Sequence, residues 1–264
     1  MFGNAINHRF LINFAKYRYL LFELVKRDIK VKYRRSVLGI FWSLLEPLLT
    51  MLVLFMIFST IFAKNIHNFP IYLLTGRLIF SCFNSGSKGA MRSIRRNAGM
   101  LKKVYIPKYM YALGKVFSEF IFFAISLVVL FGVMVVTHAP FTIYILVSAI
   151  PLLILLIFTV GAGLLLATLS VFFRDIDYLY GIFTMMLMWG SAIFYPISIV
   201  PAKYQFIFTY NPIYAIISMC RDCYLYGHMF PMNTLIFATS SALAIFFIGV
   251  LVFYKYQDRF ILYL

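Results

Sequence analysis

The sequence predicts an all-helical integral membrane protein, with six transmembrane helices in a single domain that covers residues 1–264. Its composition leads to this fold class. Apolar residues make up 63% of the chain and charged residues only 12%, whereas soluble domains are nearer half apolar and a quarter charged. A soluble core of this length could not bury so much apolar surface. Ordinary globular enzymes, disordered chains and disulfide scaffolds are therefore excluded.

Six apolar runs approach the length of about 20 residues that a helix needs to cross a bilayer. In chain order, the runs cover residues 37–63, 70–90, 109–137, 141–173, 178–196 and 232–254. The second run is the least apolar. The fourth is long enough to tilt or to project beyond the bilayer.

The positions of the basic residues predict the orientation. With these spans, 19 Lys and Arg fall in the segments on one side and 3 on the other, while Arg77 and Lys115 lie within spans. Cytoplasmic segments of membrane proteins are enriched in Lys and Arg. Both termini are therefore predicted to be cytoplasmic. The net charge of +16 is mainly a topology signal, and nucleic acid is not an expected partner.

Two stretches outside the predicted spans are also expected to form regular structure. Residues 17–35 mix basic and apolar positions at roughly helical spacing, which indicates an amphipathic helix on the cytoplasmic surface. A simple polybasic segment that only sets the topology is the alternative. Residues 197–231 are rich in proline and aromatic residues. They predict short helices that dip into the outer leaflet, with a plain structured loop as the alternative.

Several catalytic and metal-binding motifs are missing. The sequence has no G-x-x-x-x-G-K-[ST] phosphate loop, so the chain is not expected to hydrolyse ATP itself. Cys220 and Cys223 have no further metal ligands nearby and are interpreted as inert, with an outward-facing disulfide as the minor alternative. Asp175 and Asp177 have the spacing of a sugar-transferase metal pair, but they lie in a short turn. Helix capping is the favoured interpretation, and no metal site is expected.

Charged side chains inside spans are costly and call for partners. Glu46 precedes Pro47 in the first span, at a predicted depth of about 15 Å. Glu119 is predicted at a similar depth, where Lys115 could pair with it. Arg77 is predicted about 15 Å above Glu46, without a carboxylate at its own depth. It either extends toward the outer surface or lines a polar conduit.

Aromatic and small residues have simpler interpretations. Phe41, Trp42 and Tyr195 fall near span ends, where interfacial belts concentrate aromatic side chains. Stacking against sugar rings in a transport path is the functional alternative. Gly161 and Gly163 are expected to permit close packing between helices.

Three strings carry a resemblance to one protein family. They are LVKRDIKVKYRRSVLGIFWSLLEPLL at 24–49, RNAGMLKKVYIPKYMYALGKV at 96–116 and YNPIYAIISMCRDCYLYG at 210–227. In this order and spacing, they resemble signatures of the permeases of polysaccharide-export ABC transporters. These are the membrane subunits that export O-antigen, capsule or teichoic acid. The third string departs from the family pattern at Cys220 and Cys223.

The resemblance implies a multi-pass subunit of the bacterial cytoplasmic (inner) membrane that is not an enzyme. Its implied partners are a second copy of itself, two ATP-binding cassette subunits that bind ATP and Mg²⁺, membrane lipids and a lipid-linked polysaccharide. This chain is expected to bind no cofactor. A membrane-embedded glycosyl or acyl transferase is the alternative function.

The resemblance also assigns roles along the chain. Residues 17–36 would form an interface and gating helix, with 27–36 at the cytoplasmic entrance. Residues 91–103 would be the loop that couples to the ATPase, and 198–230 the outer gate helices. The expected coupling residues are Arg95, Arg96, Asn97, Gly99 and Lys102.

The resemblance also implies that the glycan is carried on an isoprenoid pyrophosphate or a related lipid, and this phosphate suggests further site residues. Arg binds phosphate in a bidentate fork that Lys cannot copy, and Arg34 and Arg35 precede the first span at headgroup depth. We therefore expect both arginines to receive the phosphate head, unless they only anchor the helix to anionic lipids. The remaining residues predicted along the entrance and substrate path are Phe41, Trp42, Glu46, Arg77 and Tyr195.

Overall fold

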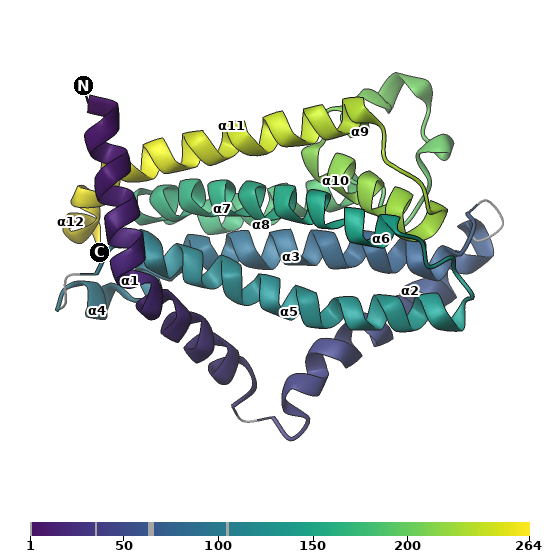
Figure 1. Cartoon of the computed structure of the whole chain (residues 1–264), viewed down its shortest axis with the longest axis horizontal. Helices are drawn as coiled ribbons and strands as arrows, with labels where there is room; N and C mark the ends of the chain where they lie inside the picture. Colours follow the sequence, from purple (N-terminus) through teal and green to yellow (C-terminus); the bar gives the residue numbers. More distant parts are fainter. Residues whose placement is uncertain (1, 35, 63–65, 104–105) are drawn as a thin grey trace.

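A computed structural model shows a bundle of long helices that run side by side (Figure 1). It describes residues 2–34, 36–62, 66–103 and 106–264, and their side chains from Tyr17 onward except at positions 33 and 62. The bundle contains α3 (Phe69–Arg96), α5 (Tyr109–Val136), α7 (Ala149–Phe172), α8 (Ile176–Trp189) and α11 (Met232–Tyr256). All regular structure in the described ranges is helical, which confirms the predicted fold class.

The helix α3 forms the centre of the bundle and packs against both α5 and α7. Most of its side chains are buried, including polar ones such as Thr75, Ser87 and Ser93. Ser87 and Ser93 donate hydrogen bonds to carbonyls of their own helix, which removes most of the cost of burying them. Since α3 is covered by protein, it needs no continuous apolar surface. This explains why the second predicted span is the least apolar.

The helices α7 and α11 pack closely because two glycines lie at their crossing. A methyl group on Gly161 would lie 2.5 Å from the Phe246 backbone nitrogen, and one on Gly249 would overlap the Gly161 carbonyl. A methyl group on Gly163 would lie 2.8 Å from the Ala90 Cβ atom of α3. The predicted role of Gly161 and Gly163 in close packing is confirmed.

The first two helices leave the bundle and form a V (Figure 1). The helix α1 (Phe2–Tyr33) crosses one end of the bundle and packs on α5. It is followed by a single 3-10 turn, η1 (Gly39–Phe41), and by α2 (Trp42–Phe62), which contains Pro47. Most apolar side chains of α2 remain at least partly exposed, so this helix offers a long uncovered surface.

The segment between α8 and α11 folds into short helices at the far end of the bundle, opposite the end that α1 crosses (Figure 1). These are η3 (Ile197–Ile199), η4 (Ala202–Tyr204), α9 (Phe206–Thr209), α10 (Pro212–Arg221) and the π-helical turn η5 (Asp222–Tyr226). Cys220 and Cys223 are buried here as free thiols and form no disulfide with each other. Their inert character remains a prediction.

The buried side chain of Arg221 connects the segment between α8 and α11 to the bundle. Its guanidinium donates hydrogen bonds to the carbonyls of Tyr72, Ala192 and Ile193 at 3.1–3.2 Å and lies 3.4 Å from the centre of the Tyr72 ring. The Tyr72 hydroxyl donates in turn to the carbonyls of Ala192 and Tyr195. One cation therefore fixes the turn after α8 by hydrogen bonds to backbone oxygens and stacking on a ring.

Four helical stretches in the described ranges are long and apolar enough to cross a membrane. They are Gly39–Ile61, Tyr109–Val136, Tyr144–Phe172 (α6, Tyr144–Val147, with α7) and Met232–Tyr263 (α11 with α12, Phe260–Tyr263). The apolar helix α8 is shorter, and α3 is less apolar. The start of α1 and the C-terminal helix α12 lie at the same end of the bundle, called the N/C end below (Figure 1). Six spans with cytoplasmic termini remain a prediction.

Candidate functional site

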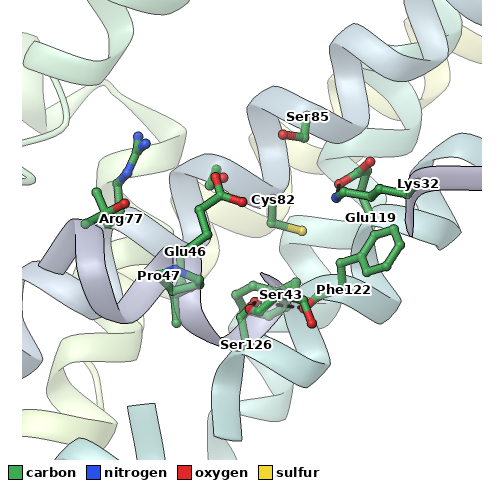
Figure 2. Close-up of a pocket in the computed structure, with 14 residues that line it drawn as sticks. Lys32, Ser43, Glu46, Pro47, Arg77, Cys82, Ser85, Glu119, Phe122 and Ser126 are labelled. Atoms are coloured by element: carbon green, nitrogen blue, oxygen red, sulfur yellow. Dashed lines mark hydrogen bonds and ion pairs between the residues drawn. The ribbon is translucent and has the colours of Figure 1, made fainter. Parts of the chain in front are cut away.

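A polar pocket of about 100 Å³ lies between α2, α3 and α5, beside the last turn of α1 (Figure 2). Charged and hydroxyl side chains predominate in its lining. The lining residues are Lys32, Ser43, Glu46, Pro47, Thr50, Arg77, Leu78, Ser81, Cys82, Ser85, Glu119, Phe122, Phe123 and Ser126. Such a concentration of polar groups between apolar helices marks the pocket as the candidate functional site.

The start of α2 is held against α5 by hydroxyl groups. The Ser126 hydroxyl donates to the Ser43 carbonyl at 3.0 Å and to the Phe122 carbonyl of its own helix at 2.9 Å. The Ser43 hydroxyl donates to the Ile40 carbonyl in the preceding turn. Pro47 lacks a backbone N–H, so one carbonyl in the first turns of α2 has no helical partner. These contacts place the first two turns of α2 at the pocket.

Lys32 and Glu119 form an ion pair at the edge of the pocket, with 3.5 Å between Nζ and Oε2. The Lys32 ammonium also lies 3.8 Å from the centre of the Phe122 ring. The predicted pairing of Glu119 with Lys115 is wrong, because Lys115 binds Asp28 at 3.0 Å. The cause is the docking of α1 on α5, which brings carboxylate and ammonium groups of α1 to both residues.

Glu46 and Arg77 line this same pocket from α2 and α3 (Figure 2). The prediction that they differ in depth by about 15 Å is therefore wrong. It assumed that the first span begins near residue 37, whereas α2 begins at Trp42, at the vertex of the V. Arg77 lines a polar pocket. Within the described part of the chain, neither Glu46 nor Arg77 has an ion-pair or side-chain hydrogen-bond partner, so both charges are available to a ligand.

The other predicted entrance residues are less closely gathered. Phe41 and Trp42 lie beside the pocket at the start of α2, and their side chains are exposed. Arg34 is exposed just beyond the end of α1, and Arg35 lies outside the described residues. Tyr195 lies in the segment after α8, where its hydroxyl donates to the Trp189 carbonyl. The structure therefore joins Glu46 and Arg77 in one pocket and leaves Tyr195 apart from it.

The predicted coupling region lies at the N/C end, where α3 is followed by the single turn α4 (Ala98–Leu101). Asn97 links the two helices and donates a side-chain hydrogen bond to the Ser93 carbonyl at 2.7 Å. The side-chain amide oxygen of Asn97 accepts a hydrogen bond from Arg27 of α1 at 3.4 Å. Gly99 has open space around the position of a side chain. The side chains of Arg96 and Lys102 are exposed as well.

Asp177 joins the first turn of α8 to the last turns of α3. Arg92 Nε donates to its carboxylate at 2.7 Å, and Arg95 binds the second carboxylate oxygen. Asp175 occupies the N-cap position of α8 without a side-chain capping bond. The expected capping role is therefore wrong for Asp175, and Asp177 serves as an ion-pair centre. The signal in the sequence was an acidic residue that starts one predicted helix and basic residues that end another.

Comparison of the amino-acid sequence with known proteins identifies a family. Residues 19–225 match the ABC-2 type transporter family. The chain belongs to this family. An O-antigen export system permease protein RfbA from Klebsiella pneumoniae is 29% identical, with coverage of 91% of this chain and 93% of the relative. RfbA from Myxococcus xanthus is 27% identical, with coverage of 82% and 84%. The polysialic acid transport protein KpsM from Escherichia coli is 23% identical, with coverage of 86% and 89%.

Membership of the ABC-2 type transporter family confirms the resemblance seen in the sequence. The chain is a transport permease of the inner membrane and not itself an enzyme. The apolar helices of the structure agree with a multi-pass location. The polar pocket at the start of α2 is thus part of a transport subunit.

Proposed function

We propose that the chain is the membrane subunit of an ATP-driven exporter that moves a lipid-linked polysaccharide across the bacterial cytoplasmic membrane. The observation that carries the proposal is the similarity to an O-antigen export permease and to a polysialic acid transport protein, over most of the chain and of each relative. The cargo would be an O-antigen, capsule or teichoic-acid-like glycan.

The polar pocket supports a hydrophilic cargo. Hydroxyl groups of Ser81, Ser85 and Thr50 face it, together with the charges of Glu46 and Arg77. Sugars exchange hydrogen bonds with such groups, whereas an acyl chain does not. We assign Glu46 and Arg77 to the substrate path on this basis.

The residues around the pocket extend the proposed path in both directions. Arg34 and Arg35 would receive the phosphate head of the carrier lipid, and Phe41 and Trp42 would stack against sugars that enter. Tyr195 would face the glycan nearer the far end of the bundle. Residues 17–36 would act as the gating helix and 198–230 as the outer gate, in a subunit with six spans and both termini in the cytoplasm.

A second copy of the chain would complete the path. A pocket of about 100 Å³ holds a few water molecules and no glycan chain. The uncovered surface of α2 and an exposed apolar stripe on α8 are available for pairing. This stripe contains Leu179, Ile182, Phe183 and Met186, at the i, i+3, i+4, i+7 spacing of a single helix face. We propose that two copies enclose the conduit along these surfaces.

Two ATP-binding cassette subunits would bind below residues 91–103 and supply ATP and Mg²⁺. The turn α4 and the exposed basic residues Arg96 and Lys102 fit this docking role, whereas the Arg95 guanidinium is paired with Asp177. Gly99→Trp places a bulky group in open space, so it should leave the fold intact and block docking. We expect loss of export at a normal level of inserted protein. Normal export by this variant would argue against docking at α4.

The test of the proposed function compares the purified chain with the complete complex in lipid vesicles. The chain alone should show no ATP hydrolysis, and the complex should hydrolyse ATP faster when lipid-linked glycan is present. A Walker A lysine variant of the ATPase subunit is the control for contaminating activity. ATP hydrolysis by the chain alone would count against the proposal. An ATP hydrolysis rate of the complex that does not change when glycan is added would also count against it.

The phosphate role of the arginines has its own test. Arg34→Lys combined with Arg35→Lys keeps the charge and removes the bidentate fork. We expect glycan-stimulated hydrolysis to fall more than basal hydrolysis, while the protein still inserts and assembles. Export at the wild-type level would leave only a lipid-anchoring role for both arginines.

A further inference from the structure

A second hollow lies between α1 and α5 and differs in character from the polar pocket. It has a volume of about 720 Å³, and apolar side chains predominate in its lining. The lining residues are Arg18, Leu21, Phe22, Val25, Lys26, Ile29, Lys30, Phe117, Phe120, Ile121 and Ala124. This set is called the α1–α5 groove below. Phe22 and Ile121 are 63% and 40% exposed, so the groove is open to the surroundings.

Three cations border the α1–α5 groove, all from α1. Arg18, Lys26 and Lys30 have no ion-pair partner among the described residues. Their neighbours on α1 differ, because Arg27 binds Asp28 and Lys32 binds Glu119. The groove therefore combines an apolar floor with three uncompensated positive charges.

The walls of the groove are fixed by contacts on an adjacent face of α1. Asp28 binds Lys115 and Lys32 binds Glu119, at one-turn intervals on both helices. On α5, Phe117, Ile121 and Ala124 recur at the spacing of one helix face. Glu119, Phe122 and Ser126 occupy the neighbouring face, which lines the polar pocket. The groove is thus separate from the proposed glycan path.

We propose that the α1–α5 groove binds an anionic phospholipid of the cytoplasmic leaflet, such as phosphatidylglycerol. An acyl chain would lie against Phe117, Phe120 and Ile121, and the phosphate would lie between Lys26 and Lys30, which are one turn apart on α1. Arg18, about 12 Å further along the helix, would add to the positive potential of the groove. Charge complementarity identifies the occupant, because basic residues next to an apolar surface attract anionic lipids. A zwitterionic lipid would match the apolar floor but not the three charges.

The bound lipid would be a resident ligand rather than the cargo. It would fill the gap beside the amphipathic helix and hold α1 against α5, next to the ion pair at the pocket. The site depends only on the groove and its charges, so its failure would leave the proposed transport function untouched.

Native mass spectrometry of the full chain, extracted from vesicles of equal phosphatidylglycerol and phosphatidylethanolamine, tests the site. We expect the wild-type chain to retain phosphatidylglycerol about tenfold over phosphatidylethanolamine. The triple variant Arg18→Gln, Lys26→Gln, Lys30→Gln should lose this preference, and the charge-conserving pair Lys26→Arg, Lys30→Arg should keep it. Ala124→Trp, which fills the groove, should reduce retention of both lipids.

The matched control removes three exposed cations outside the groove, by Lys102→Gln, Lys103→Gln and Lys255→Gln. It should retain phosphatidylglycerol like the wild-type chain. Equal retention of the two lipids by the wild-type chain would overturn the proposal, as would equal losses in the control and the groove variant. Displacement of phosphatidylglycerol by equimolar undecaprenyl phosphate would also overturn it and assign the groove to the carrier lipid. Melting temperatures confirm that each variant is folded.

Discussion

The Lys32 ammonium of α1 lies 3.5 Å from the Glu119 carboxylate of α5, at the edge of the polar pocket. One turn earlier on both helices, Asp28 binds Lys115 at 3.0 Å. The two ion pairs have opposite polarity, so they fix the register of α1 along α5. A shift of α1 by one turn would place like charges together. The helix proposed to gate the entrance is therefore joined to the wall of the proposed path.

Reversal of one pair tests whether it holds the two helices. Lys32→Glu should lower both export and melting temperature, because two carboxylates would then face each other. Addition of Glu119→Lys should restore part of both. Since Lys32 is partly exposed, we expect a coupling energy of only about 0.5–1 kcal/mol in a double-mutant cycle by thermal unfolding. Additive effects of the two changes would show that the pair contributes nothing.

The crossing of α7 and α11 predicts unequal effects of two Gly-to-Ala changes. Gly161→Ala should destabilise the protein by about 1–3 kcal/mol, because the new methyl group would lie 2.5 Å from the Phe246 backbone. Gly132→Ala on α5 is the matched control, since no atom lies within 4 Å of that methyl position. It should be neutral or slightly stabilising. Equal melting temperatures of the two variants in detergent would contradict the packing.

One carboxylate, that of Asp177, makes the charged link between α3 and α8, in addition to the hydrogen bond between the Ser87 and Tyr180 hydroxyls. Asp177→Asn would leave Arg92 and Arg95 without their common anion, and we expect a loss of about 1–3 kcal/mol in unfolding free energy. Asp175→Asn changes an exposed neighbour without a side-chain partner and should have no effect. Denaturation of both variants in the same detergent makes the comparison. Similar losses would mean that general charge, and not the ion pair, matters.

The partly buried carboxyl group of Asp222 should make the stability of the protein depend on pH. Burial raises the pKa of its carboxyl group from 3.8 to about 6, although His228 and Arg221 act in the opposite direction. Between pH of about 4 and 6 the folded state then binds more protons than the unfolded state, so this group's contribution to stability falls as the pH rises through that range. Above pH of about 6 the buried carboxylate carries its full penalty.

Asp222→Asn removes the penalty and should raise the melting temperature most at pH 7.5. The gain should be smaller at pH 5 and nearly absent at pH 3, where the carboxyl group is mostly protonated in both states. Asp175→Asn controls for the loss of one negative charge. A gain of the same size at all three pH values would contradict a titrating carboxylate at position 222.

Long apolar runs made most helices predictable. The apolar run 109–137 predicts a membrane-spanning helix, and α5 covers Tyr109–Val136, because its ends are set by a proline segment and a polar turn. The predicted ends agree less well with the structure where packing between helices determines where a helix stops. The helix α3 continues to Arg96, beyond the predicted end at residue 90, since Met91 and Ile94 are buried against other helices. The helix α8 ends at Trp189, before Gly190, and not near Pro196.

The charged contacts of the site were less predictable than its residues. Glu46, Arg77 and Glu119 stood out because charges within apolar runs are costly. Their grouping depends on the tilt of α2 and on the face of α5 that α1 covers, and neither follows from the periodicity of a single segment. A depth counted along the sequence therefore separated Glu46 from Arg77, although both line one pocket.

The most direct test of the transport function follows the glycan in cells that lack this chain but retain the ATPase subunit. If the chain exports the glycan, lipid-linked polysaccharide should still be made in these cells, accumulate on the cytoplasmic side of the membrane and disappear from the cell surface. Expression of the wild-type chain should restore surface glycan. Loss of glycan synthesis itself would instead indicate a transferase, and normal surface glycan would contradict a role in its export.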